Sequence, residues 1–267
     1  TISISEEDAA VSASDLNAIN AITSIAVNLA NVTSITASDF DDLTTLNTNR
    51  AEFSNITGIT AITVTDNGGG DESVDYGTLE TIIDNYQTNF NSDVAFSFQS
   101  GDTIVIDSDS ELSAFLADIG SGAIELTNQS VIIDSAAPIT VSQANTIDEL
   151  TEGTITASIA TDSTVDSLKT LTGTNAYTIV IPPDDGHGRL ASDLITIKAA
   201  TSVSLDGSLI STVIGSYDEV TDVYDSGVTA LSSEDITITD ELSVAEANIL
   251  DLLTCLLYTS PSPRDRS

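Results

Sequence analysis

The sequence predicts an α/β repeat protein, a helix–strand solenoid of about nine short units. Three observations predict this fold class. Segments of the sequence recur, short amphipathic stretches are followed by stretches of alternating polarity, and the polar side of the alternating stretches is mostly Thr, Ser and Asn. The alternation predicts a sheet with one face covered by helices and one face in water. Tandem β-sandwich domains are the alternative, because one recurrence is spaced by 103 residues.

Two repeat units carry the internal similarity. The first, ASDLNAINAITS at 13–24, returns as ASDLITIKAATS at 191–202 with eight of twelve positions identical. The second, VSQANTIDELT at 141–151, returns as VAEANILDLLT at 244–254. Downstream of the first unit, GITAI at 58–62 and ITVTD at 62–66 are similar to GVTAL at 227–231 and ITITD at 236–240.

A helix followed by a strand is expected in each unit. Leu16, Ile19 and Ile22 have helical spacing after Ser14, which we expect to be the N-cap, and residues 24–29 alternate as in a half-buried strand. Further strands are expected at 123–126 and 177–181 and around Ile236 and Ile238. Helices are expected to start near residues 14, 38, 75, 110, 142, 164, 192, 216 and 243, on average about 29 residues apart.

The organisation of the chain follows from the repeats. We expect repeat units at 1–66, a divergent stretch at 67–138, repeat units with a truncated last copy at 139–254, and a non-native tail at 255–267. The tail holds the only Cys, two of the five prolines and two of the six basic residues, and it resembles a translated sequencing adapter. The chain contains no Met, which predicts a fragment of a longer protein.

The composition excludes several classes of function. With 42 acidic and 6 basic residues, the net charge is −36, which is incompatible with nucleic-acid binding through a basic surface. One His and one Cys exclude zinc sites built from Cys and His, as well as disulfide scaffolds. No apolar run is long enough to predict membrane insertion. Apolar residues nevertheless make up 40% of the chain, which is enough for an aliphatic core.

Two acidic loops are candidate calcium sites. Asp107, Asp109 and Glu111 place carboxylates at alternate positions after an expected strand, and Ca²⁺ takes six to eight oxygen ligands. The alternative is a helix N-terminus capped by Ser108 or Ser110. The second loop contains Asp66 and Asp71 around three glycines, whose backbone carbonyls a cation could also use; the alternative there is a surface turn.

Catalytic motifs are sparse. The only His, His187, lies in the run Asp184–Arg189 without a G-x-S-x-G elbow, so a solvated loop is expected there. Paired carboxylates could serve glycoside cleavage, but so acidic a chain brings some carboxylates together by chance. A polysaccharide-active solenoid enzyme is therefore the alternative to a non-catalytic chain.

The repeat sequences at 13–24 and 141–163, together with TLTGTNAYTIVIP at 170–182, resemble the repeats of giant adhesin-like proteins that marine bacteria, cyanobacteria included, secrete or carry on their surface. The resemblance implies an extracellular or cell-surface setting. The resemblance does not imply calcium binding, because the glycine–aspartate nonapeptide of RTX repeats is absent. We therefore expect a non-catalytic structural spacer or adhesive surface, with a glycan or surface ligand as its partner and calcium as its only expected cofactor.

Overall fold

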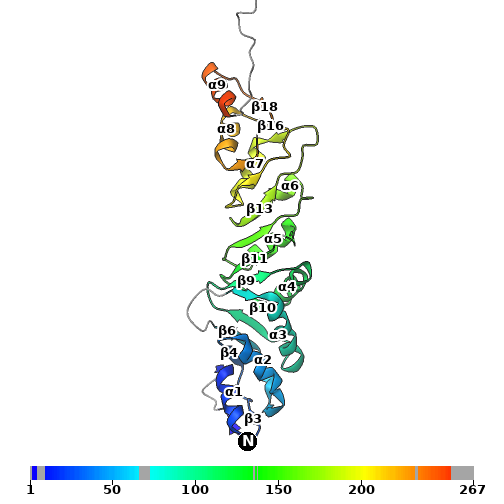
Figure 1. Ribbon diagram of the computed structural model, residues 1–267, viewed down its shortest axis with the longest axis vertical. Helices are drawn as coiled ribbons and strands as arrows, with labels where there is room; N and C mark the ends of the chain where they lie inside the picture. The colour runs from blue at the N-terminus through cyan, green and yellow to red at the C-terminus, as the bar shows by residue number, and fades with distance from the viewer. Residues whose placement is uncertain are drawn as a thin grey trace, which may run out of the picture. The chain divides into compact units, whose positions relative to one another are not determined.

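The computed structural model describes residues 2–4, 10–65, 73–134, 136, 138–231 and 234–253. The chain divides into two compact units. Unit 1 comprises Thr1–Pro138 and Gln143–Ser158, and unit 2 comprises Ile139–Ser142 and Ile159–Ser267. Both units contain helices and parallel strands, which confirms the predicted α/β class (Figure 1).

Unit 1 contains helices α1 to α4, and α5 has most of its residues there. The helices are α1 (Ala13–Ile22), α2 (Phe40–Thr48), α3 (Tyr76–Asn89), α4 (Asp109–Ser121) and α5 (Val141–Asp148), with 3-10 turns η1 (Arg50–Glu52) and η2 (Ile56–Gly58). The strands are β1 (Ile2–Ser3), β2 (Ala10–Ser12), β3 (Val27–Asn28), β4 (Ser34–Ala37), β5 (Phe53–Ser54), β6 (Ala61–Val64), β7 (Ser73–Asp75), β8 (Ala95–Phe98), β9 (Thr103–Ile106), β10 (Ile124–Glu125), β11 (Ser130–Ile133) and β12 (Ile155–Ser158).

The strands of unit 1 form three parallel arrays with the orders β1-β3-β5, β2-β4-β6-β8-β10 and β7-β9-β11-β12. The helices pack in chain order, α1 on α2, α2 on α3 and α3 on α4 (Figure 1). A strand precedes each of these helices and a second strand follows it, as in β2–α1–β3. Parallel pairing requires such crossovers, because consecutive parallel strands cannot be joined by a tight turn.

Unit 2 repeats this plan. Its helices are α6 (Val165–Leu168), α7 (Ala191–Ala199), α8 (Tyr217–Asp225) and α9 (Val244–Leu253). Its strands are β13 (Ala176–Val180), β14 (Arg189–Leu190), β15 (Leu205–Asp206), β16 (Thr212–Gly215), β17 (Val228–Thr229) and β18 (Asp235–Ile238). They pair in parallel in the orders β13-β15-β17 and β14-β16-β18, and α8 packs against both α7 and α9.

The core of each unit is built from columns of apolar side chains in register across the strands. In unit 1, Ile35, Ile62, Phe96 and Ile124 are paired neighbours on successive strands, and all four are buried. Along β4, β6, β8 and β9 the buried residues alternate with partly exposed ones, so one face of the sheet is solvated as predicted.

Unit 2 has the equivalent column of Ile179, Leu205 and Val228. Because the described strands pair in parallel, the antiparallel β-sandwich alternative does not apply to them. The columns therefore give both units the same kind of core.

All nine predicted helix starts are confirmed within two residues. One finer prediction is wrong, and one sequence similarity does not extend to the structure. Ser12, and not Ser14, caps α1, because its hydroxyl accepts from the Asp15 amide at 3.4 Å. GVTAL at 227–231 contains β17, whereas GITAI at 58–62 leads from η2 into β6, so these segments are not structurally equivalent. The ITVTD and ITITD segments are equivalent, since they supply β6 and β18.

Candidate binding surfaces

The first predicted calcium loop forms the N-terminus of α4. Ser108 is the N-cap, and its hydroxyl accepts from the Glu111 amide at 3.3 Å. The Glu111 carboxylate turns back and accepts from the Asp107 amide at 2.8 Å, which completes a reciprocal cap. Asp107 and Asp109 have exposed side chains on either side of this cap. The three carboxylates therefore lie together at the N-terminus of α4, where the helix dipole stabilises negative charge.

The second predicted loop, with Asp66 and Asp71, lies outside the described residues. Four residues beyond Asp71, Asp75 caps α3 by accepting from the Thr78 amide at 2.8 Å and from the Thr78 hydroxyl at 2.6 Å. These two hydrogen bonds hold the pKa of Asp75 below its usual value. Within the described parts of the chain, no cluster of three or more His, Cys, Asp or Glu side chains has a geometry that could hold a metal ion.

The loop around His187 is held in place by Asp184. The Asp184 side chain is 5% exposed and accepts from the Ser211 amide at 3.0 Å, the Ser211 hydroxyl at 2.6 Å and the Thr212 amide at 2.9 Å. Its other oxygen lies 3.4 Å from Nε of Arg189. These contacts fasten the loop to the start of β16. Asp184 and Arg189 therefore have a structural role, and His187 is exposed, as expected.

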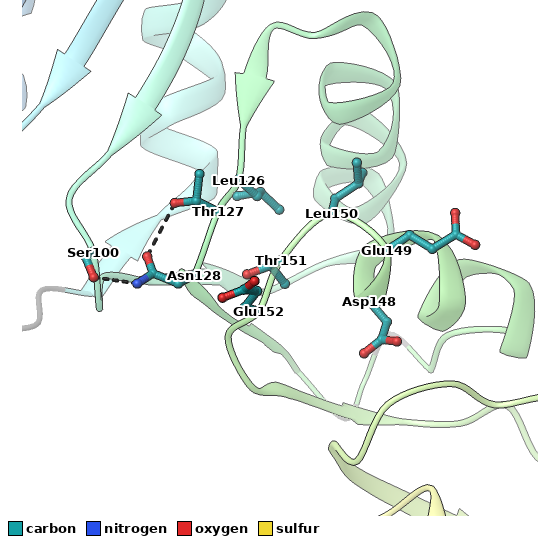
Figure 2. A pocket seen from close by; sticks show the side chains of 9 residues that line it. All are labelled: Ser100, Leu126, Thr127, Asn128, Asp148, Glu149, Leu150, Thr151 and Glu152. Carbon is teal, nitrogen blue, oxygen red and sulfur yellow. Dashed lines mark hydrogen bonds between the residues drawn. The ribbon is translucent and has the colours of Figure 1, made fainter.

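A hollow of about 590 Å³ lies in unit 1 between the segments that precede β11 and follow α5 (Figure 2). It is lined by Ser100, Leu126, Thr127, Asn128, Asp148, Glu149, Leu150, Thr151 and Glu152. Asn128 bridges two strand ends through hydrogen bonds with Ser100 and Thr127. In Figure 2 the carboxylates of Asp148 and Glu149 point away from each other, so they do not form the facing pair that glycoside cleavage uses.

A group of interacting acidic side chains lies between α3 and α4. The hydroxyl of Tyr76 donates to Asp118 at 2.7 Å. Burial raises the pKa of Asp118, the bond from Tyr76 lowers it, and the neighbouring Asp84 raises it further, with a net upward shift. Burial, with Asp84 next in effect, also raises the pKa of Glu80. These residues carry no recognisable pattern in the sequence, because their proximity depends on how the two helices pack.

The raised pKa of Asp118 predicts a pH dependence of stability. Because the folded state binds this proton more tightly, the free energy of unfolding contributed by Asp118 falls as pH rises above its ordinary value of 3.8. Asp118→Asn should therefore flatten the decline in stability that sets in above about pH 4, measured by urea unfolding. Asp162→Asn, on an exposed loop, is the control. An equal change in stability at every pH for Asp118→Asn would contradict the assignment.

A threonine near the end of a repeat unit, Thr151 in one and Thr201 in another, hydrogen-bonds to a neighbouring segment of the chain. The hydroxyl of Thr151 donates to the Gln129 carbonyl at 2.6 Å and accepts from the Gly153 amide at 3.0 Å. Thr201 makes the same two contacts, donating to the Tyr177 carbonyl at 2.7 Å and accepting from the Val203 amide at 3.2 Å. A threonine at the corresponding place near the end of both repeat sequences is a signal from which this contact could have been predicted.

The solvated face of β4, β6 and β8 is a shallow surface of small side chains. It consists of Ser34, Thr36, Ala61, Thr63, Ala95 and Ser97, which are partly exposed and in register. The hydroxyls of Thr63 and Ser97 are hydrogen-bonded to each other at 3.1 Å. This surface offers hydroxyl and methyl groups at the strand spacing of about 4.8 Å.

The fold and these surfaces define the chain as an α/β protein made of recurring strand–helix–strand segments. No family model, curated protein or solved structure matches it. Among the described helices, none has the length and apolar character needed to span a bilayer.

Proposed function

We propose that this chain is a non-catalytic repeat segment of a large bacterial secreted or surface protein, acting as a structural spacer or adhesive surface. The observation that carries the proposal is that the recurring sequence elements have structural roles. Thr151 and Thr201 hydrogen-bond to the carbonyls of neighbouring segments, and the ITVTD and ITITD segments supply equivalent strands. Repetition is then explained by stacking, as in a helix–strand solenoid, and not by chemistry at one site.

The surface chemistry supports the same proposal. A chain with a net charge of −36 remains soluble at high concentration and repels other acidic chains, and seawater salt screens that repulsion to a few ångströms. The small hydroxyl-bearing side chains on the solvated face of β4, β6 and β8 suit shallow contact with a glycan or a solid surface. The resemblance to giant adhesin-like repeats favours an extracellular or cell-surface location.

The proposal is tested by assaying the chain against a panel of marine and bacterial polysaccharides, for both retention and the release of reducing ends. We expect no release of reducing ends above the level of heat-unfolded protein. Retention on one class of glycan, reduced by Thr63→Lys on the solvated face and unaffected by Asp162→Lys, would identify the adhesive surface. Turnover abolished by a single Asp or Glu substitution would contradict the proposal and favour the paired-carboxylate enzyme.

Calcium stiffening is part of the proposal and has its own test. If Asp107 and Asp109 bind Ca²⁺ beside the Glu111 cap, millimolar Ca²⁺ should raise the melting temperature relative to EDTA at constant ionic strength, because a ligand of the folded state stabilises it by mass action. Mg²⁺ should not reproduce the rise, and the double variant Asp107→Asn with Asp109→Asn should abolish it. Superimposable melting curves with Ca²⁺ and EDTA would remove calcium from the proposal.

A further inference from the structure

Strand β18 corresponds to β6 by sequence, but in the described residues it pairs with one strand, whereas β6 pairs with two. The ITVTD segment forms β6, which pairs with β4 on one side and with β8 on the other. The related ITITD segment forms β18, which in the described residues pairs with β16 alone. Strand β11, the third strand of its array, likewise has neighbours on both sides, β9 and β12. In both complete cases the added strand, β8 or β12, follows a helix.

The side chains of β18 are exposed where their equivalents are buried. Ile62 on β6 and Val131 on β11 are fully buried, and each faces an apolar residue of the added strand, Phe96 and Ile155 respectively. Ile236 holds the equivalent position on β18 and is partly exposed. Among the described residues, no strand covers Ile236 at the edge of β18 that faces away from β16, which is called the free edge here.

Helix α9 shows the same contrast with its sequence copy α5. Val141 at the start of α5 is 4% exposed, whereas Val244 at the same position of α9 is 80% exposed. Two exposed polar residues, Thr146 in α5 and Glu149 just after its end, correspond to Ile249 and Leu252 in α9, which are 45% and 80% exposed. At 3.6 residues per turn, Val244, Ile249 and Leu252 fall within about 140° of one another, on one side of the helix.

We propose that the free edge of β18 and the apolar side of α9 form a docking site for one more repeat segment of this chain's own kind. The segment enters as a parallel strand with the pattern of residues 155–158, ITAS, which fills the same place beside β11. Backbone hydrogen bonds to the edge supply the affinity, and alternate apolar side chains covering Ile236 and Ile238 supply the specificity. This inference holds whether or not the chain is a spacer.

The pairing of β11 with β12 sets the register. Val131 pairs with Ile155, so the isoleucine of the docked strand lies opposite Ile236. The segment at 255–267 has no such alternation, and its two prolines lack the amide hydrogen that a strand needs. The repeat unit at 141–151 continues after Thr151 as EGTITASIATDS at 152–163. We therefore choose that sequence as the segment to test for docking.

The test replaces residues 255–266 with a second copy of residues 152–163 in the otherwise full chain. We expect the melting temperature to rise by about 2–4 °C or more. The amides of β18 that face away from β16 should exchange with solvent at least tenfold more slowly. The matched control is the same graft with the copied Ile155 and Thr156 interchanged, which keeps composition and length but turns the apolar side chain to the solvated face.

Two results would overturn the proposal. The first is that the graft and its interchanged control have the same melting temperature and the same exchange rates at β18. The second is that the unmodified chain forms a dimer in sedimentation velocity, with its β18 amides protected as in the graft, which would make a second copy the occupant. Failure of the polysaccharide assay leaves both measurements unaffected, so the two proposals are tested separately.

Discussion

Gly153→Ala should lower the free energy of unfolding by at least about 3 kcal/mol, at the upper end of overpacking substitutions. A Cβ at this position would lie 2.2 Å from the Gln129 carbonyl oxygen, 2.4 Å from the Gln129 carbonyl carbon and 2.7 Å from the Ser130 amide nitrogen. All three are backbone atoms, so no side-chain rotation relieves the clash. Urea unfolding of the variant and the parent chain measures the effect.

The backbone against Gly153 is held from several directions. The buried Gln129 side chain donates to the carbonyls of Phe98 and Gln99, each at 3.1 Å, and the backbone carbonyl of Gln129 accepts from the Thr151 hydroxyl. The control is Gly120→Ala in α4, where nothing lies within 4 Å of the new Cβ, and it should stabilise the chain by about 0.5–1 kcal/mol. A loss for Gly153→Ala no larger than about 0.5 kcal/mol would contradict the close packing of these segments.

Phe96→Ala should destabilise the chain by about 3–5 kcal/mol, the usual range for a fully buried aromatic residue. Phe96 lies in the column between Ile62 and Ile124, and its ring meets Tyr86 edge-on with 5.9 Å between the ring centroids. Truncation of Phe96 to Ala therefore removes its packing within the column and its ring contact with Tyr86 of α3. Chemical denaturation measures the loss, with circular dichroism to verify that the variant folds.

The control for this prediction is Ile22→Ala, at an α1 position that is 86% exposed. It should change stability by less than about 0.5 kcal/mol, because a surface substitution removes little buried area. If Phe96→Ala also fell within that range, the column would not be the main source of stability in unit 1.

Helices were predictable from the sequence because their signals are local. The spacing of Leu16 with Ile19, or of Val220 with Val223, marks a helix face within a few residues. The solvated strand face was predictable for the same reason, since alternation within four residues determines it. The cap of α1 was misplaced by two residues because Ser12 and Ser14 are equally good caps by composition.

The arrangement of the strands was not predictable, because it depends on pairing between residues far apart in the chain. Ile62 pairs with Phe96 after 34 residues, and nothing local to β6 selects β8 as its partner. Strands of two residues, such as β3 and β5, carry too little pattern to detect. The Tyr76–Asp118 contact also required the packed structure. The capping role of Glu111 did not, because the spacing of Ser108 and Glu111 is that of a capping box.

Native-state hydrogen exchange at increasing denaturant tests most directly the central claim that the chain is a stack of recurring segments. In a stack each segment contacts only its neighbours, so opening free energies should be graded within each unit. We expect the lowest opening free energies for the edge strands β2 and β18 and higher ones for β6, β9 and β11. A single opening free energy shared by all strands would instead indicate one indivisible core and contradict the account.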